Sequence, residues 1–304
     1  MKVSVIIPCY NHKRFVLKAI KSVLEQSWPD VELIVIDDGS TDGSKEIIEQ
    51  FHSTRSEFIF IARENRGLVY TLSQGLQLAT GDFVCELASD DFFPYDSVEK
   101  RVRYLIAHPE TVAVFADGWL VDENDKVVSD TIVTGLRRNL FFQNDPIRKL
   151  IEGNFPVFST CLFRREHFIK AGGFDFETFR FYEDLEPPIL LSLQGKIDFI
   201  PEKVIYRRIH SENVSLTSTH IRIEKFYLYK KLLKNHKLAA YHWLIKKRLE
   251  REFFKLLRGV CRQPHAYDGR AIELIENFGK KFLFNGPRFI YYYFLFLLIR
   301  SKKN

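Results

Sequence analysis

The alternation of short apolar runs with helix-like segments over the first ninety residues constrains this chain most strongly. Residues 2–8 (KVSVIIP) and 31–37 (VELIVID) are β-branched runs bounded by turn residues, a pattern typical of strands buried on both faces. Between them, residues 14–26 place apolar side chains at helical spacing. The same alternation then predicts a helix, a strand, a helix and a strand over residues 43–51, 57–62, 68–79 and 82–87. We therefore expect an α/β fold with a mostly parallel sheet flanked by helices.

Polar and aromatic residues follow each of the four predicted strands. The carboxyl ends of parallel strands meet at one edge of a sheet, and open α/β sheets bind ligands there. We therefore expect one crevice lined by Pro8-Cys9-Tyr10-Asn11, Asp37-Asp38-Gly39-Ser40, Arg63-Glu64-Asn65-Arg66-Gly67 and Ser89-Asp90-Asp91.

Length and charge divide the chain into two regions. The 304 residues are 46% hydrophobic and include 28 Phe and 13 Tyr, which excludes a disordered chain. A single core stops growing near ~250–300 residues, so the length allows one large α/β domain or a domain with an appendage. Strand-like runs at 112–116 and 157–163 complete the first region, residues 1–220, which has a net charge of −8. Residues 221–304 are predicted helices rich in Lys, Arg and aromatic residues, with a net charge of +14.

The sequence favours a cytoplasmic protein. The start, MKVSVIIP, meets proline too early for the apolar core of a signal peptide. The longest apolar run, Phe289 to Ile299, has eleven residues, whereas a membrane-spanning helix needs about 20. The four cysteines lie far apart without a CxxC pair, which favours buried free thiols in a reducing compartment.

Asp37 and Asp38 follow a predicted buried strand and precede a flexible turn. A carboxylate there can accept hydrogen bonds from a ribose or from the imide N–H of a uracil. Tyr10, one strand over, is placed to stack on the base. The alternative interpretation is a solvated loop in which an Asp or Ser caps the next helix.

Asp90 and Asp91 stand at the end of another predicted strand. Mg²⁺ and Mn²⁺ prefer one or two carboxylates together with diphosphate oxygens, so this pair is a candidate metal site. The alternative is that the two aspartates cap a helix over residues 94–107.

Six ordered motifs resemble glycosyltransferase family 2 over residues 1 to about 215: SVIIPCYN, SVLEQS, VIDDGSTD, NRGL, ATGDFVCELASDD and GGFD…YED. The resemblance implies a GT-A fold, which is Rossmann-like with a mixed, mostly parallel sheet. It also implies inverting transfer of a sugar from a nucleotide diphosphate donor. By that similarity Asp90 binds Mn²⁺ or Mg²⁺, and the nucleoside pocket is lined by Pro8, Tyr10, Asp38 and Asn65, with Asp37 close by.

The metal motif departs from the pattern of the family. The usual Asp-x-Asp-Asp reads Ala88-Ser89-Asp90-Asp91 here. The last acidic member of the metal motif is kept, and we include Ser89 among the donor-binding residues. The loss of the first Asp supports the alternative of a non-catalytic nucleotide-sugar binding or scaffold protein.

Inverting transfer needs a carboxylate that deprotonates the acceptor hydroxyl opposite the leaving diphosphate. Asp184 is our candidate, because it matches the second position of the Glu-Asp block of the family, with Glu183 beside it. An acidic helix start before Pro187 and Pro188 is the alternative. Arg208 and His210 match an Arg-x-His segment that lies near the diphosphate and metal in the family. The alternative for His210 is a structural role.

The basic, aromatic C-terminal region predicts a membrane-surface element. Phe289 to Ile299 lies between Arg288 and Arg300; aromatic residues favour the headgroup boundary and basic residues attract anionic lipids. The alternatives are docking on the first region and a dimer interface in a homo-oligomer. No nucleic-acid module is recognised.

We therefore expect a metal-dependent transferase that moves a hexose or N-acetylhexosamine, from a UDP-sugar, onto a saccharide of a bacterial capsule or O-antigen. The expected acceptor is carried on undecaprenyl diphosphate, with the protein peripheral on the inner face of the plasma membrane. A processive synthase is disfavoured because the Gln-x-x-Arg-Trp block is not found.

Overall fold

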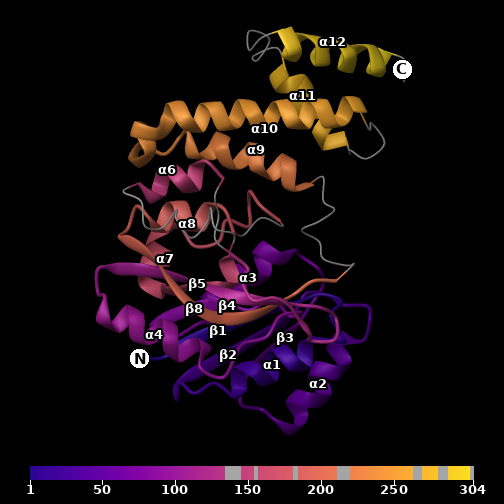
Figure 1. Cartoon of the computed structure of the whole chain (residues 1–304). Coiled ribbons are helices and arrows are strands. Elements are labelled where there is room, and N and C mark those ends of the chain that lie inside the picture. The colour runs from indigo at the N-terminus through magenta and orange to yellow at the C-terminus, as the bar shows by residue number, and fades with distance from the viewer. Residues whose placement is uncertain are drawn as a thin grey trace. The chain divides into compact units, whose positions relative to one another are not determined.

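The computed structural model describes residues 1–133, 145–153, 157–180, 184–210, 220–262, 269–279 and 287–301. The chain divides into two compact units, Met1–Asn213 and Val214–Asn304 (Figure 1). Each unit has its own apolar core.

The first unit is built on one mixed sheet. Its strand order is β3-β2-β1-β4-β7-β5-β6, with β8 paired to β5. The first four strands pair in parallel, as predicted, and so do β5 and β8, whereas β7 and β6 run antiparallel to their neighbours. The strands are β1 (Val3–Cys9), β2 (Val31–Asp37), β3 (Ile59–Ala62), β4 (Phe83–Glu86), β5 (Thr111–Val121), β6 (Val127–Ser129), β7 (Leu162–Arg164) and β8 (Lys196–Arg208).

Helices cover both faces of this sheet. Figure 1 shows α1 and α2 on one side and α3 and α8 on the other. On the α3 side, a Cβ added to Gly75 would lie 2.5 Å from Ile6 in β1, so this helix packs tightly on the central strand. The helices are α1 (Val16–Leu24), α2 (Ser44–Thr54), α3 (Leu68–Leu78), α4 (Ser97–Ala107), α6 (Pro146–Ile151), α7 (Arg165–Ala171) and α8 (Glu186–Leu191).

The strand predicted over residues 157–163 is confirmed only at its end, where β7 begins at Leu162. Residues 157–163 form a 3₁₀ turn, η1 (Phe158–Thr160), before the short β7. The Thr160 hydroxyl donates to the Val157 carbonyl at 2.7 Å, and the Cys161 amide donates to the Phe158 carbonyl at 2.8 Å. Such local hydrogen bonds compete with strand pairing, so the ladder starts only at Leu162.

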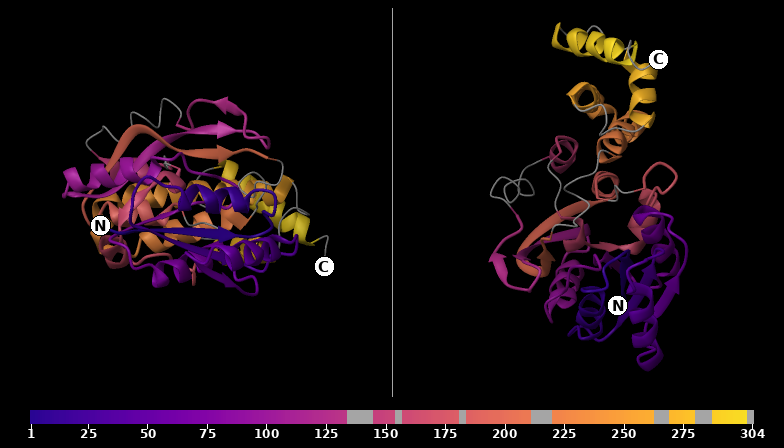
Figure 2. Two further views of the ribbon diagram at one scale, coloured as in Figure 1. Left: turned by 90° about the horizontal axis from the view of Figure 1, so that it is seen from below. Right: turned by 90° about the vertical axis from the view of Figure 1, so that its right-hand side faces the viewer.

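The second unit is helical, as predicted. Its buried side chains are mainly aromatic and aliphatic; Phe253, for example, contacts Phe226 and Phe289 with ring centroids 5.7 and 5.8 Å apart. No helix in the described part of the chain combines the length and the apolarity required to cross a bilayer. The elements are α9 (His220–Leu232), η3 (His236–Tyr241), α10 (His242–Arg262), α11 (Gly269–Gly279) and α12 (Pro287–Ser301), and Figure 2 gives two further views of the chain.

The four cysteines are free and buried, as predicted. Burial, with the nearby charge of Asp37, raises the pKa of the Cys9 thiol to about 12. Burial likewise raises the pKa of Cys261 to about 11. These thiols are packing groups rather than nucleophiles.

Candidate active site

An aromatic bridge joins the segment after β4 to β8. Phe92 and Tyr206 exchange two backbone hydrogen bonds, of 3.2 and 2.9 Å, as an isolated antiparallel pair. Their rings stack with centroids 4.6 Å apart, and the Trp119 ring stacks on the other side of Tyr206 at 4.5 Å. This bridge sets the register between Asp90, two residues before Phe92, and the segment that follows Tyr206.

Asp90 and His210 meet at that point, as the resemblance implies. His210 Nε2 lies 2.9 Å from Asp90 Oδ2, and both residues are buried. His12, from the loop after β1, joins them: one ligand atom of each of the three residues lies within 4.8 Å of the others. Two imidazole nitrogens and one carboxylate oxygen form a donor set that suits a divalent transition ion, so the described residues fit a metal.

The charges around Asp90 favour its ionised form. Burial alone would raise the pKa of Asp90, but the hydrogen bond from His210 and the charge of His12 hold it below its ordinary value. Burial, together with the charge of Asp90, raises the pKa of Asp91 well above its ordinary value. The two aspartates therefore differ in the direction of their pKa shifts, and Asp90, which favours the ionised form, is the candidate metal ligand.

Arg208 supports this cluster from within the protein. Its backbone amide donates to Asp91 Oδ1 at 2.8 Å, and its Nε donates to the Asp90 carbonyl at 2.8 Å. The rest of the guanidinium reaches the Asp122 carbonyl at 2.9 Å and the Asp125 carboxylate at 2.6 Å. With only 3% of its surface exposed, Arg208 anchors the end of β8, and its contact with a diphosphate stays a prediction.

The helix-capping alternative for Asp90 and Asp91 is wrong. The next helix, α4, begins at Ser97 with Asp96 as its N-cap residue. The carboxylates of Asp90 and Asp91 instead bond to His210 and to the backbone of Arg208. The segment after β4 thus serves the candidate metal centre rather than the helix.

The loops after β1 and β2 are tied to each other. The Asn11 amide donates to Ser40 Oγ at 2.9 Å, and Asn11 Oδ1 accepts from the Thr41 amide at 2.8 Å. Asn11 has a φ of 56°, a left-handed conformation that Asn tolerates. Tyr10, next to it, is 47% exposed and is available to stack on a ligand.

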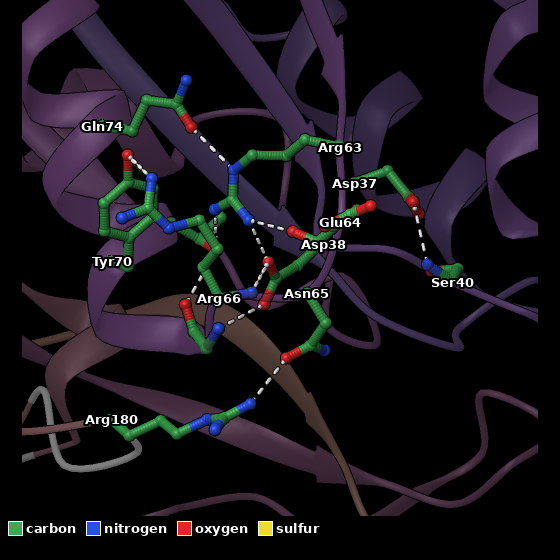
Figure 3. A network of polar contacts seen from close by, with 12 residues as sticks. Asp37, Asp38, Ser40, Arg63, Glu64, Asn65, Arg66, Tyr70, Gln74 and Arg180 are labelled. Carbon is green, nitrogen blue, oxygen red and sulfur yellow. Dashed lines mark hydrogen bonds and ion pairs between the residues drawn. The ribbon is translucent and has the colours of Figure 1, made fainter.

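Asp37 and Asp38 are both buried but differ in their partners. Asp37 Oδ1 accepts from the Ser40 amide at 3.0 Å, as Figure 3 shows. Asp37 Oδ2 is buried without a hydrogen-bond donor among the described residues. Pro8, which lies in β1 opposite Ile36, is half-buried beside this strand end.

Asp38 closes the loop after β3. Its Oδ1 accepts from the Arg63 guanidinium and from the Arg66 amide, the latter at 2.8 Å, and its Oδ2 accepts from the Gly67 amide at 2.9 Å (Figure 3). Arg63 also donates to Gln74 Oε1 at 2.9 Å. Asp38 therefore holds the loop after β3 in place, and its direct contact with a nucleoside stays a prediction. The N-cap residue of α2 is Gly43, so the loop alternative with an Asp or Ser as N-cap is wrong. Asp42 lies one residue earlier, and its Oδ1 accepts from the Ser44 amide at 2.9 Å.

Asn65 connects the loop after β3 to Arg180. Its Oδ1 accepts from Arg180 Nη2 at 3.0 Å (Figure 3). Gly67 has a φ of 92°, and a Cβ there would lie 2.5 Å from Arg180 Cγ, so the close approach requires glycine.

Asp184 lies next to a carboxylate that the sequence analysis did not single out. Glu86, the last residue of β4, is within electrostatic reach of Asp184. Burial, followed by the charge of Asp184, raises the pKa of Glu86 to about 8. Asp184 is thereby placed near the strand that leads to Asp90. Pro187 and Pro188 occupy the first turn of α8, where a missing N–H costs nothing, whereas Glu183 lies outside the described residues.

Two other residues that shape the site, His12 and Arg180, were not singled out, whereas Arg63 was expected in the crevice without an assigned role. His12 comes immediately after Pro8-Cys9-Tyr10-Asn11, the segment at the end of the first predicted strand, which was the available signal. Glu86 offered another signal, because it is an acid between the apolar residues Cys85 and Leu87 of a predicted strand. Nothing in the sequence points to Arg180.

Comparison with known proteins decides the family. A family model described as "Glycosyl transferase family 2" matches residues 4–172. An uncharacterized glycosyltransferase of Nostoc sp. is 30% identical over 230 residues, which cover 74% of this chain and 70% of the relative. This chain is a family 2 glycosyltransferase. The chondroitin synthase of Escherichia coli is 25% identical to this glycosyltransferase over 226 residues, but only 31% of that relative is matched.

Solved structures show that the fold of this glycosyltransferase is GT-A. TarS of S. aureus in complex with UDP-GlcNAc has a TM-score of 0.66 at 16% identity, covering 93% of this chain and 81% of that one. The mannosyltransferase PcManGT of Pyrobaculum calidifontis, in complex with GDP-Man and Mn²⁺, has a TM-score of 0.58 at 19% identity, covering 100% and 86%.

Proposed function

We propose that this glycosyltransferase uses a divalent metal ion to transfer a hexose or N-acetylhexosamine, with inversion, from a UDP-sugar to a saccharide hydroxyl. The observation that carries the proposal is the meeting of His12, Asp90 and His210 at the carboxyl edge of the sheet. Complexes of structural neighbours with UDP-GlcNAc, and with GDP-Man and Mn²⁺, support a nucleotide-sugar donor.

The residues at the carboxyl edge divide the work of the transfer. His12, Asp90 and His210 would hold the ion, which when bound stabilises the negative charge of the leaving diphosphate. Tyr10, exposed beside the ends of β1 and β2, stacks on the base. Asp38, Arg63 and Asn65 keep the neighbouring loop after β3 in place through their hydrogen bonds.

Asp184 is the proposed base. It takes the proton of the acceptor hydroxyl, whose oxygen attacks the anomeric carbon as the bond to the diphosphate breaks. An ionised carboxylate is needed for this step. Glu86, whose pKa is raised to about 8 by burial and by the charge of Asp184, stays largely protonated near neutral pH and so adds little negative charge beside Asp184.

The acceptor we propose is a growing bacterial cell-surface polysaccharide, such as a capsule or an O-antigen, carried on undecaprenyl diphosphate. Relatives named chondroitin synthase of Escherichia coli, hyaluronan synthase of Pasteurella multocida and putative teichuronic acid biosynthesis glycosyltransferase of Bacillus subtilis support a polysaccharide product. The basic second unit supports an acceptor at a membrane surface.

Turnover of UDP-sugars with Mn²⁺ tests the enzyme proposal. Release of UDP from a panel of UDP-sugars should be detectable for the wild type. Asp184→Asn should lower kcat at least 100-fold and leave the Kd for UDP within about twofold, because removal of a general base costs typically 10²–10⁴ in rate. Glu166→Gln, at an exposed residue of α7 paired with Lys170, is the matched control.

Two results would contradict this assignment. Wild-type-like turnover in Asp184→Asn would exclude Asp184 as the base. Tight UDP binding without turnover of any UDP-sugar by the wild type would instead favour the non-catalytic scaffold alternative.

The second unit supports a proposal for the membrane. Four apolar side chains on one face of α12 are exposed by 40–63%: Ile290, Tyr291, Phe294 and Leu297. The opposite face, with Phe289, Tyr293 and Phe296, is buried. On α10, Lys247, Arg251, Arg258 and Arg262 form an exposed basic stripe. We propose that this unit binds anionic lipid at the inner face of the plasma membrane.

Sedimentation of the full chain with vesicles tests this attachment. Phe294→Ser combined with Leu297→Ser should lower binding to phosphatidylglycerol-containing vesicles several-fold, because both side chains lose their apolar contact. Ile106→Ser, at a 49% exposed position of α4 in the first unit, is the matched control. Equal binding by the double variant and the control would count against the membrane and favour docking or dimer formation.

A further inference from the structure

His12 is held in place by contacts that leave one ring nitrogen available. Its backbone amide donates to Ser44 Oγ at 3.0 Å, and its carbonyl accepts from the Val16 amide at 2.9 Å at the start of α1. The ring is oriented by Ser89, whose Oγ lies 2.8 Å from Nδ1. Nε2 is then the nitrogen left to bind an ion. A hydrogen bond to the distal ring nitrogen is the usual way in which proteins orient a metal-binding histidine.

The rings of His12 and His210 contact each other edge to face. Their centroids lie 5.8 Å apart at an interplanar angle of 86°, and Phe15 borders both rings at 6.4 and 5.3 Å. Neighbouring ligands of an octahedral ion, bound at about 2.1 Å, lie about 3.0 Å apart. The separation of 2.9 Å between His210 Nε2 and Asp90 Oδ2 matches that spacing, so an ion can replace their hydrogen bond with little movement.

The two nitrogen ligands and one oxygen ligand of this site favour some divalent ions over others. Mg²⁺ prefers oxygen ligands and gives up water reluctantly, whereas imidazole nitrogens suit transition metals. Affinity for a nitrogen-containing site rises from Mn²⁺ to Co²⁺ in the Irving–Williams order. A second imidazole therefore adds affinity for Co²⁺ and Mn²⁺ and adds little for Mg²⁺.

We infer that His12 is a third protein ligand of the metal ion, and that the pair of imidazoles makes the site selective for Mn²⁺ and Co²⁺ over Mg²⁺. The inference rests on the proposed metal-dependent function and specifies which residue sets the choice of ion. Ser89 acts as a positioning residue, because it orients the ring of His12.

Titration of the full chain with CoCl₂, MnCl₂ and MgCl₂, without nucleotide, tests the inference. The wild type should bind Co²⁺ more tightly than Mn²⁺ and Mn²⁺ more tightly than Mg²⁺, by calorimetry. His12→Gln should weaken Co²⁺ binding at least 10-fold, change the visible absorption of bound Co²⁺, and leave Mg²⁺ binding within about twofold. His236→Gln, at an exposed histidine of the second unit, is the matched control.

Ser89→Ala provides a second variant that keeps the imidazole. It should weaken Co²⁺ binding several-fold, and this result carries the test if His12→Gln does not fold by circular dichroism. Unchanged Co²⁺ affinity and absorption in His12→Gln, or in Ser89→Ala where the first variant does not fold, would overturn the inference. An equal loss of Mg²⁺ and Co²⁺ affinity would also overturn it, because His12 would then act through shape rather than as a nitrogen ligand.

The failure of this inference is distinguishable from failure of the proposed function. If His12→Gln keeps full Co²⁺ affinity while the wild type turns over a UDP-sugar, only the ligand assignment fails. If the wild type binds Co²⁺ through His12 but turns over no donor, the assignment holds and the proposed transferase activity fails.

Discussion

Replacing Glu86 with Gln should change how the stability of the first unit depends on pH. Burial, followed by the charge of Asp184, raises the pKa of Glu86 from 4.5 to about 8. The folded state therefore binds a proton that the unfolded chain releases between those values. The stability contributed by protonated Glu86 is fully present below pH 4.5 and is lost as the pH rises to about 8.

The size of this loss follows from the same pKa values. A pKa difference of one unit corresponds to 1.36 kcal/mol, so a rise from 4.5 to about 8 corresponds to on the order of 5 kcal/mol in the free energy of unfolding. Gln cannot release a proton. The difference in free energy of unfolding between Glu86→Gln and the wild type should therefore shift by several kcal/mol in favour of the variant between pH 5 and pH 8.

Urea unfolding followed by far-UV circular dichroism at pH 5, 6, 7 and 8 measures this shift. A difference in the free energy of unfolding that is the same at every pH reflects how the Gln amide packs. The test is whether this difference changes with pH. Glu25→Gln, at an exposed residue after α1, is the control and should follow the wild type. Parallel profiles for Glu86→Gln and the wild type would refute a buried, protonated Glu86.

Two further substitutions test contacts inside the first unit by the same unfolding assay. Arg63→Ala should destabilise the first unit by about 3 kcal/mol, because it leaves the buried Asp38 carboxylate without its cation, and a loss below about 1 kcal/mol would contradict that pairing. Gly75→Ala should cost about 1–3 kcal/mol, because the new Cβ would lie 2.5 Å from Ile6 Cγ2; a gain in stability from helix propensity alone would show that this contact yields easily.

Much of the fold could be predicted because the strands of the parallel part are short apolar runs with turn residues at both ends. β1 and β2 are the clearest cases, since their side chains are buried on both faces. The segment 157–163 could not be predicted in the same way. Its apolar residues fit a strand, but hydrogen bonds formed by Thr160 and Cys161 close a local turn that the hydrophobic pattern does not encode.

The candidate site shows a similar limit. Asp90 and His210 come together as the resemblance implies, because each lies beside a strand end. His12 belongs with them only because the loop after β1 folds back onto Ser44 and Ser89. The role of Glu86 depends on its burial beside Asp184, which spacing along the chain does not show. The roles of His12 and Glu86 thus depend on contacts with residues far away in the sequence, which sequence motifs do not specify.

The stack of Phe92, Tyr206 and Trp119 has a consequence for observing this protein. Lys18 caps the Phe92 ring at 3.6 Å and Lys203 approaches the Trp119 ring at 5.2 Å, so the three rings form a column with a cation at either end. Asp90 is two residues from the first ring of this column. Indole emission depends on the local electric field, so a variant in which Trp28 and Trp243 are replaced by Phe would leave Trp119 as an optical reporter of this column without an attached dye.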